Sequence, residues 1–459
     1  MASLGIRATI LFARNLENPE QIRKLTDALQ GALGDELPAL IGVDQEGGAV
    51  ARLREGVVAL PSMMALGATR DPDLAERAGR RLGSDLRRLG INLNFAPVLD
   101  LALEPRNTVI GTRSFGSDPR AVSEFGRAFA SGLGAGGVVA VGKHFPGHGA
   151  TESDSHVTQP VVLADIGTLR ARDLIPFKAA IEARIPALMT GHVRVPALDS
   201  ELPATLSRVI LRDVLREQLQ FTGALFSDCL EMGALGEADP SLAPRALAAG
   251  VDCILISHRL DLAESSIDAI ARAVERGELP LDILSAAAAR MRALRGRIGV
   301  APSAHGDEEI GRAIAHKAVT IVRGGMHLEA RSAVSVISFE GGESASLSSL
   351  LRRRGYKSEN MRVSLDPRAD ELELLQNVIA GMPGRQVVIV MRRAHLHPAQ
   401  ASAIERLLEV VPDAMLVSAR EPFDAPLFAG ARNLACIYND TEVSLEGLAD
   451  VMTAAAADA

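Results

Sequence analysis

The chain alternates between short apolar runs and longer segments whose apolar residues recur at helical spacing. Runs such as Ala39–Asp44 and Val138–His144 are nearly continuous in apolar residues, which is typical of strands buried on both faces. Between them lie segments such as Pro19–Leu33 and Pro119–Leu133, which have amphipathic helical patterns. This alternation predicts a parallel sheet covered by helices. The predicted strands are Ala8–Ala13, Ala39–Asp44, Asn92–Val98, Val138–His144, Ala187–His192, Ala224–Asp228 and Asp252–Ile256.

Polar residues at the strand ends decide between the two architectures that fit this pattern, a (β/α)8 barrel and a large doubly wound sheet. In a barrel the carboxyl ends of the strands converge on one face, whereas an open sheet would spread them along an edge. We therefore predict a (β/α)8-type TIM barrel over residues 1–298. Only seven strands are recognised, so one barrel strand is missing from the pattern. The polar residues at or just after the strand ends are Asp44, Asp100, Lys143, His144, His192 and Asp228.

A second α/β unit follows the predicted barrel. Helical spacing continues through Leu284–Arg297, and a break containing Pro302 and Gly306 follows. We assign 299–325 to a linker and a connecting helix. Strands and helices then alternate again over 326–459, which predicts a smaller three-layer α/β sandwich. Its predicted strands are Ala333–Ser338, Gln386–Met391, Ala414–Ser418 and Leu434–Tyr438.

Composition excludes several classes of protein. Among 459 residues, 47% are hydrophobic and 23% charged, as in ordinary globular proteins. The net charge of −8 without a long basic run argues against a nucleic-acid partner. Cys229, Cys253 and Cys436 are odd in number and far apart, which suggests neither a disulfide framework nor a zinc site. No apolar run has transmembrane length and the first residues lack signal-peptide features, so we expect a cytoplasmic protein without a membrane partner.

Polar residues are concentrated in the stretch Lys143–His156, where a strand leads into a loop rich in glycine. Asp154 and His156 are two positions apart, so in an extended segment they point the same way. A carboxylate beside an imidazole fixes its tautomer and raises its basicity, which suits a general acid or base. Two alternatives stay open. One is an ordinary polar surface loop; the other is a metal site that adds His144 and His148, although this spacing fits no standard zinc pattern.

Three further residues are candidates for chemistry. Asp228 at a strand end is a candidate nucleophile or electrostatic stabiliser, or alternatively a helix N-cap. Asp44 precedes a glycine pair that lets backbone approach a ligand, unless it marks an ordinary turn. Arg113 is either a ligand clamp or part of a structural ion pair. A carboxylate, an imidazole dyad and groups that bind hydroxyls suit glycoside hydrolysis, in which His156 would protonate the leaving oxygen.

With these motifs the chain resembles the bacterial β-N-acetylhexosaminidases of glycoside hydrolase family 3. The resemblance covers nearly the whole chain, and its most specific part is Lys143–Gly149 together with Asp154–His156. It implies that Asp228 is the nucleophile and that His156, paired with Asp154, is the acid/base. The residues that it implies bind or line the sugar site are Asp44, Arg113, Lys143, His144 and His192. The matching segments are Ile10–Asn15, Val43–Gly48, Asn94–Asp100, Gly111–Gly116, Lys143–Gly149, Asp154–His156 and Phe226–Asp228.

The resemblance implies retaining hydrolysis of a terminal β-linked N-acetylglucosamine, typically from muropeptide fragments during cell-wall recycling, without a metal or organic cofactor. A phosphorylase is the first alternative, because a neutral imidazole repels phosphate less than a carboxylate does. A non-catalytic sugar-binding protein is the second, and a metallohydrolase is the weakest. The oligomeric state is left open.

Three features depart from the family's pattern. Cys229 follows the expected nucleophile where a second acid is usual, and Ala49 stands where the family often has arginine. The chain also begins near the family's second barrel strand, so we expect the barrel to lack its first strand. Because every matched site residue lies later in the chain, this last departure concerns barrel closure more than the site.

Overall fold

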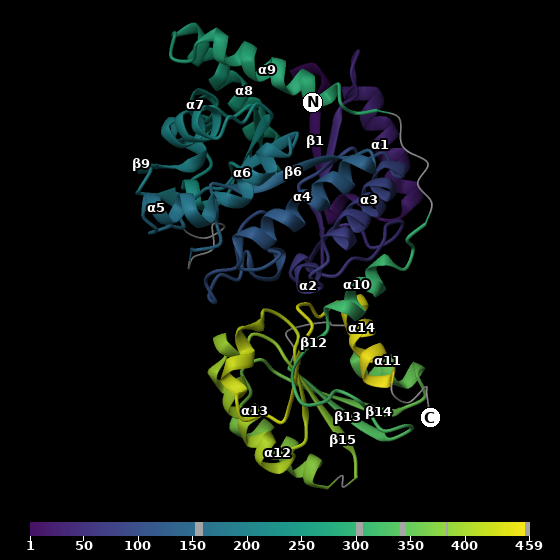
Figure 1. The fold of residues 1–459 in the computed structure, drawn as a ribbon. Helices are drawn as coiled ribbons and strands as arrows, with labels where there is room; N and C mark the ends of the chain where they lie inside the picture. Colours follow the sequence, from purple (N-terminus) through teal and green to yellow (C-terminus); the bar gives the residue numbers. More distant parts are fainter. Residues whose placement is uncertain (152–158, 300–305, 340–345, 382–383, 455–459) are drawn as a thin grey trace. The chain divides into compact units, whose positions relative to one another are not determined.

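The computed structural model describes residues 1–151, 159–299, 306–339, 346–381 and 384–454. The chain forms two compact units, and Figure 1 traces the elements of each. The first unit consists of Met1–Glu46, Val50–Val58 and Pro72–Glu308. The second unit consists of Gly47–Ala49, Ala59–Asp71 and Glu309–Ala459. Two short internal segments of the first half of the chain are therefore counted with the second unit.

The first unit is built on a seven-stranded sheet in which neighbouring strands are parallel and follow one another in sequence order. This is the strand order of a β/α barrel, and all seven predicted strands are confirmed, although most are shorter than predicted. Two short ribbons, β3 (Gln45–Gly47) with β4 (Val50–Ala51) and β8 (Arg194–Val195) with β9 (Asp199–Pro203), stand apart from the sheet. The sheet strands are β1 (Ala8–Leu11), β2 (Leu40–Val43), β5 (Leu93–Asn94), β6 (Val139–Phe145), β7 (Ala187–Thr190), β10 (Ala224–Cys229) and β11 (Cys253–Leu255).

Helices connect the strands of this sheet and cover its outer face (Figure 1). Their starts follow local chemistry: the Asn18 side chain accepts the Gln21 N–H at the first helix, and Asp118 plays the same role before Pro119. The glycine at Gly132 has a packing role, because a Cβ there would overlap the carbonyl oxygen of Glu76 on the neighbouring helix. The helices are α1 (Pro19–Leu33), α3 (Pro72–Arg88), α4 (Pro119–Ala135), α6 (Ile175–Glu182), η6 (Val209–Gln218), α7 (Leu242–Ala249), α8 (Leu260–Glu275) and α9 (Leu281–Arg295).

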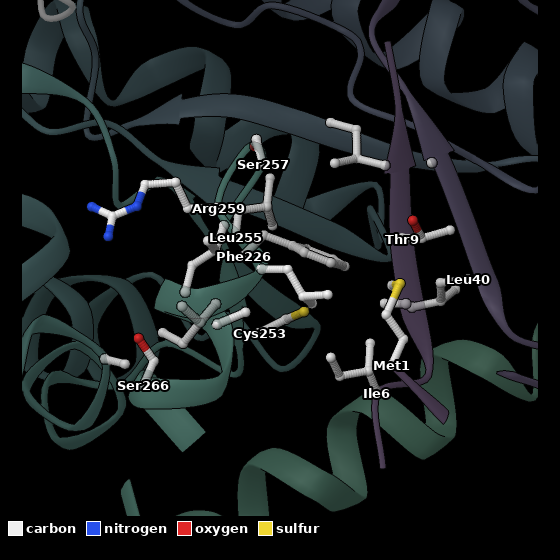
Figure 2. Close-up of a pocket in the computed structure, with 18 of the residues that line it drawn as sticks. Met1, Ile6, Thr9, Leu40, Phe226, Cys253, Leu255, Ser257, Arg259 and Ser266 are labelled. Atoms are coloured by element: carbon white, nitrogen blue, oxygen red, sulfur yellow. The ribbon is translucent and has the colours of Figure 1, made fainter. Parts of the chain in front are cut away.

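The two end strands of the sheet, β1 and β11, both line a cavity of about 370 Å³ (Figure 2). Most of the lining is apolar; Phe226 and Leu255 are examples. In the strand order the two end strands are not neighbours, so the described part of the sheet is curled but open. A closed eight-stranded barrel would have one more strand between them. None of the residues predicted for catalysis or sugar binding belongs to the described lining of this cavity.

The second unit is a six-stranded sheet with the order β12-β17-β16-β15-β13-β14, in which only β12 is antiparallel. Apolar residues are buried on both of its faces, which α10, α11 and α14 cover on one side and α12 and α13 on the other (Figure 1). The strands are β12 (Thr320–Arg323), β13 (Ala333–Phe339), β14 (Lys357–Val363), β15 (Gln386–Met391), β16 (Met415–Ser418) and β17 (Asn433–Cys436). The helices are α2 (Met63–Ala68), α10 (Ile310–Ala318), α11 (Leu347–Arg353), α12 (Ala369–Ala380), α13 (Pro398–Val410) and α14 (Glu442–Thr453).

The sequence patterns missed the two edge strands of this sheet. β14 carries polar residues at most positions, and β12 is largely exposed. An edge strand is covered less completely than a central one, so its apolar signal is weak. The four central strands, which are buried, were predicted correctly. Over the described ranges, none of the helices combines the length and the apolar character needed to cross a membrane.

Candidate active site at the carboxyl ends of the strands

Polar side chains gather where the parallel strands of the first unit end. Asp44 and Glu46 follow β2, Asp100 follows β5, and Asp228 lies near the end of β10. Strand β6 contributes Lys143 and His144 from its last residues, and His192 follows β7. The carboxyl ends of parallel strands meet at one edge of the sheet, and this edge is where α/β enzymes place their sites.

Four charged residues form one connected cluster, which we call the Glu46 cluster: Asp44, Glu46, Arg113 and Lys143. Arg113 binds Glu46 in a bidentate fork, with Nε to Oε2 at 2.9 Å and Nη2 to Oε1 at 2.8 Å. Lys143 Nζ lies 2.6 Å from Glu46 Oε1 and 2.7 Å from Asp44 Oδ1. Glu46 and Lys143 are buried, while the side chains of Asp44 and Arg113 are each 18% exposed. The buried pair therefore orients the two members that reach the surface.

Electrostatics keep Glu46, Arg113 and Lys143 charged at neutral pH. Burial acts to raise the pKa of Glu46, but Arg113 and Lys143 outweigh it and the pKa falls to about 2. Burial likewise acts against the charged form of Lys143, yet Asp44 and Glu46 raise its pKa. Two acids and two bases balance one another, which is the condition under which buried charges are tolerated.

A second connected group, the Asp100 cluster, fixes the segment after β6. Asp100 Oδ2 lies 2.6 Å from His144 Nδ1 and accepts the His144 N–H at 3.1 Å, and Oδ1 accepts the His148 N–H at 2.7 Å. Burial acts to raise the pKa of Asp100, but the charge of His144 and its hydrogen bonds lower it overall. Gly149 completes the turn, because a Cβ there would overlap the Leu101 carbonyl. The ionised carboxylate thus holds the His144 ring in one orientation.

His148 is buried inside this cluster with one ring nitrogen in use. Its Nδ1 lies 2.9 Å from Thr151 Oγ1, whereas its buried Nε2 has no hydrogen-bond partner among the residues that the structure describes. Burial, which outweighs the nearby Asp100, lowers the pKa of His148 to about 4. His148 is therefore neutral at physiological pH and cannot serve as a proton donor there.

Asp228 is partly exposed, as Asp44 is, but among the residues that the structure describes no Lys or Arg forms an ion pair with it. Within the described residues its carboxylate accepts one hydrogen bond, from the N–H of Cys229 to Oδ1 at 2.8 Å. Burial acts to raise its pKa, but the charges of His192 and His144 lead the effects that lower it overall. The carboxylate is ionised and available, as a nucleophile requires.

His192 is fully buried and acts electrostatically on the Asp228 carboxylate. Its Nδ1 is 2.7 Å from Thr205 Oγ1 and its Nε2 is 2.9 Å from the carbonyl oxygen of Cys229. Both ring nitrogens are engaged with protein groups, so the geometry favours a role in positioning the backbone after Asp228. Direct sugar binding by His192 stays a prediction.

The structure brings most of the predicted site residues together. Lys143 bonds directly to Asp44, Arg113 joins them through Glu46, and both His144 and His192 act electrostatically on Asp228. The predicted acid/base pair, Asp154 and His156, lies outside the described residues.

Sequence reasoning missed the roles of three residues. Glu46 was part of a quoted motif, but only its neighbour Asp44 was singled out. Asp100 was recognised as a strand-end residue without an assigned role, and His148 was considered only as a metal ligand. The sequence did contain a signal for Glu46. This acid follows a predicted strand closely, and the motifs of the chain also contain the cations Lys143 and Arg113, with which a buried acid would be expected to pair.

Comparison with known proteins agrees with this arrangement. Residues 1–294 match the family model of the glycosyl hydrolase family 3 N-terminal domain. A beta-hexosaminidase of Chromobacterium violaceum is 42% identical over 274 residues, which cover 58% of this chain and 76% of that protein. A beta-hexosaminidase of Thiobacillus denitrificans is 39% identical over 306 residues, 65% of this chain and 82% of the relative.

Solved structures resemble both units. A family 3 beta-N-acetylglucosaminidase from Paenibacillus sp. superimposes with a TM-score of 0.91 at 35% identity, covering 98% of this chain and 91% of that one. A beta-glucoside phosphorylase has a TM-score of 0.80 at 18% identity over 98% of this chain and 90% of its own, a likeness that concerns the fold alone. The match of the family model to well over half of the sequence, together with these relatives, shows that the chain belongs to glycosyl hydrolase family 3 and is a glycoside hydrolase.

Proposed function

We propose that the protein is a retaining exo-β-N-acetylglucosaminidase that removes a terminal β-linked N-acetylglucosamine. The observation that carries this proposal is Asp228, an ionised and partly exposed carboxylate at the end of β10 whose pKa is also lowered by Lys143 of the Glu46 cluster. The similarity to beta-hexosaminidases and to a beta-N-acetylglucosaminidase supports the choice of sugar. Muropeptide fragments are the natural substrates that we expect.

In this proposal Asp228 attacks the anomeric carbon. The new bond from its carboxylate oxygen forms as the glycosidic C–O bond breaks, and the departing oxygen takes the bonding electrons and a proton. Water then attacks the glycosyl-enzyme, gives up a proton, and releases the sugar with its β configuration retained. The positive charge that develops on the ring in both steps is stabilised by the same carboxylate.

We assign the proton transfer to His156, held by Asp154. These residues lie outside the described part of the chain, so the assignment depends on the sequence motif. The described histidines support it indirectly. His148 is neutral and buried, His192 has both ring nitrogens engaged, and His144 is fixed by Asp100. None of the three offers an ordinary proton donor at the surface of the site.

The Glu46 cluster supplies the sugar-binding groups. Asp44 and Arg113 are its partly exposed members, so their remaining hydrogen-bonding capacity faces outward. Lys143 is buried and holds Asp44 in place. An anionic acceptor beside a cationic donor matches the hydroxyl groups of a pyranose, each of which both donates and accepts.

The test is hydrolysis of an aryl β-N-acetylglucosaminide, with and without phosphate, while the anomeric configuration of the first product is followed by NMR. We expect wild-type turnover, β-configured N-acetylglucosamine as the first product, and no sugar 1-phosphate. An α-configured first product would exclude the double displacement. Strong stimulation by phosphate with formation of sugar 1-phosphate would identify a phosphorylase.

The role of His156 is tested separately with two leaving groups. His156→Ala should slow a substrate with a poor leaving group much more than an activated aryl glycoside, because only the poor leaving group needs the proton. Equal losses on both substrates would count against His156 as the acid.

A further inference from the structure

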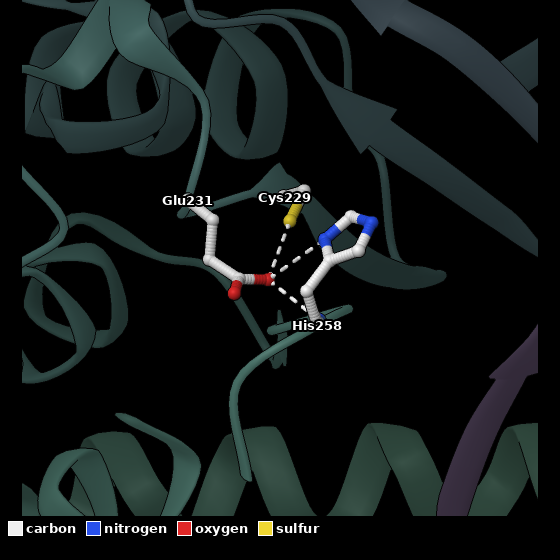
Figure 3. Close-up of side chains that lie close together, drawn as sticks. All are labelled: Cys229, Glu231 and His258. Carbon is white, nitrogen blue, oxygen red and sulfur yellow. Dashed lines mark hydrogen bonds and ion pairs between the residues drawn. The ribbon is translucent and has the colours of Figure 1, made fainter. Parts of the chain in front are cut away.

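Three potential metal ligands form a cluster (Figure 3), and one of them, Cys229, directly follows the proposed nucleophile in the sequence. Cys229 ends β10, Glu231 follows two residues later, and His258 lies in the segment after β11. Glu231 Oε2 is 3.3 Å from the Cys229 sulfur and 3.4 Å from His258 Nδ1. One ligand atom of each residue lies within 4.8 Å of those of the other two. The three side chains converge from two neighbouring strands of the sheet.

These separations match those between the ligands of a tetrahedral zinc ion. Zinc bonds of about 2.3 Å to sulfur and about 2.0–2.1 Å to nitrogen or oxygen place neighbouring ligand atoms roughly 3.3–3.6 Å apart. Two of the three pairs already have such distances. His258 has a side chain that is 59% exposed, so it can turn to close the third.

The surroundings of the cluster hold the carboxylate in place. Glu231 Oε2 accepts the N–H groups of Ser257 and His258 at 2.5 and 2.9 Å. Burial acts to raise the pKa of Glu231, but these two hydrogen bonds lead the effects that lower it. The carboxylate is therefore ionised and fixed to the segment that carries His258, as hydrogen bonds to a ligand from outside a metal site commonly achieve.

The thiol needs the metal to become a ligand. Burial is the largest of the effects that raise the pKa of Cys229 to about 11, and the charge of Glu231 adds to it. Without metal the thiol is protonated at neutral pH, so formation of a metal–sulfur bond would release one proton to solvent.

We propose that Cys229, Glu231 and His258 form a binding site for a divalent transition metal of the Zn²⁺ class, with a fourth position left for water. A thiolate, an imidazole and a carboxylate together favour zinc-like ions over Mg²⁺ or Ca²⁺, which prefer oxygen ligands. The N–H of Cys229 donates to Asp228 Oδ1 at 2.8 Å, so one residue's backbone links the metal site to the nucleophile. A bound ion should therefore alter turnover, an effect that rests on the proposed role of Asp228.

Binding is tested on the full chain after treatment with a chelator. Zn²⁺ is titrated by calorimetry, and Co²⁺ is titrated while the absorption of a cobalt–thiolate bond is followed. We expect a cobalt–thiolate band in the wild type that Cys229→Ser abolishes. We also expect Cys229→Ser and His258→Ala to weaken Zn²⁺ binding by at least about tenfold, the smallest loss that removal of even an outer partner produces.

Cys253→Ser is the matched control, because Cys253 is also a free thiol at a strand end but lines the apolar cavity instead. It should keep both the cobalt–thiolate band and the wild-type Zn²⁺ affinity. Absence of the band in the wild type, or its loss in Cys253→Ser and not in Cys229→Ser, would overturn the proposed site.

The link to Asp228 has its own readout. Added Zn²⁺ should change wild-type turnover of an aryl β-N-acetylglucosaminide reversibly, and His258→Ala, which keeps its metal-free turnover, should not respond. Zn²⁺ binding with unaltered turnover would overturn the link and leave the site standing. A wild type without any turnover would count against the proposed function, while the cobalt experiment would still decide the metal site.

Discussion

Two arginine–glutamate pairs of the same geometry stand near the strand ends of the two units. Arg113 binds Glu46, and Arg393 binds Glu421, through the same atom pairs at the same distances of 2.9 and 2.8 Å. Both glutamates are buried, and the nearby arginine counteracts the effect of burial on the pKa of each. A buried bidentate ion pair at a strand end is therefore not in itself a mark of a catalytic site.

The surroundings of the two pairs distinguish them. In the first unit Glu46 also binds Lys143, which in turn holds the partly exposed Asp44. In the second unit the nearby acid Asp424 is fully buried. Its Oδ1 accepts the backbone N–H of His395 and lies 2.6 Å from Nδ1 of the same residue. Both networks keep a partly exposed arginine, Arg113 at 18% and Arg393 at 27%, but Lys143 of the first network also acts on the charge of Asp228. The position beside the proposed nucleophile therefore distinguishes a site from a scaffold better than ion pairing does.

The sharpest way to break this comparison is to remove one acid from each unit. Asp228→Ala should lower turnover by roughly 10⁴-fold or more, the order found when a catalytic nucleophile is removed, with little change in unfolding temperature. Asp424→Ala should instead lower stability, because it leaves His395 facing a void, and should keep turnover per folded molecule. Steady-state kinetics and thermal unfolding of both variants check this. Comparable turnover losses in the two would mean that the second network is also catalytic.

The matched glutamates give the next largest effect. Glu46→Gln and Glu421→Gln each remove a buried negative charge from a partly exposed arginine, which costs up to about 3–5 kcal/mol of unfolding free energy. Only Glu46→Gln should also lower turnover, by about 100-fold, since it releases Lys143 and Arg113 from their positions and misplaced binding groups cost about this much. Denaturant unfolding and kinetics separate the two effects. If Glu421→Gln lost as much turnover, the distinction between site and scaffold would fail.

The sequence predicted the parts of the molecule that depend on local pattern. Buried strands have strong apolar signals, so all seven strands of the first sheet and the central strands of the second were recognised. Strand-end acids and bases such as Asp44, Lys143 and Asp228 were found because the chain places them at one recurring position. Motif residues that lie on a single segment could therefore be identified from the sequence.

Contacts between distant segments were not predictable in the same way. Glu46 and Arg113 are 67 positions apart, and Asp100 meets His144 across 44 positions. Which acid meets which base depends on strand register and on the turn that follows each strand, and neither is set by residue type. For the same reason the cluster of Cys229 with His258 was not predicted from the sequence.

His148 provides a smaller effect that sharpens the comparison through pH. Burial lowers its pKa from 6.5 to about 4, so between these values the folded state binds fewer protons than the unfolded state. The unfolding free energy should therefore fall as the pH drops below about 6.5, with a loss of about 3 kcal/mol complete near pH 4.

His148→Gln should flatten this slope, which denaturant unfolding between pH 7 and pH 4 can measure. The Arg113–Glu46 ion pair of the first unit contributes to a pH dependence of stability in a lower pH range. The pKa of Glu46 lies at about 2 instead of 4.5, so its contribution is present above pH 4.5 and is lost as the pH falls toward 2. An unchanged slope in His148→Gln would show that another group is responsible.

The smallest expected effect comes from hydroxyl groups that orient polar partners in each unit. Thr205 Oγ1 contacts His192 Nδ1 at 2.7 Å in the first unit, and Ser418 Oγ donates to Asp424 at 3.3 Å in the second. Thr205→Val and Ser418→Ala should each cost about 1–3 kcal/mol, because a buried polar partner loses a hydrogen bond. Thr205→Val should also reduce turnover several-fold, since the His192 ring loses one of the contacts that hold it against the Cys229 carbonyl. Thr205→Ser, which keeps the hydroxyl, should restore turnover. If the serine variant were as slow as the valine variant, the lost methyl group and not the hydrogen bond would be the cause.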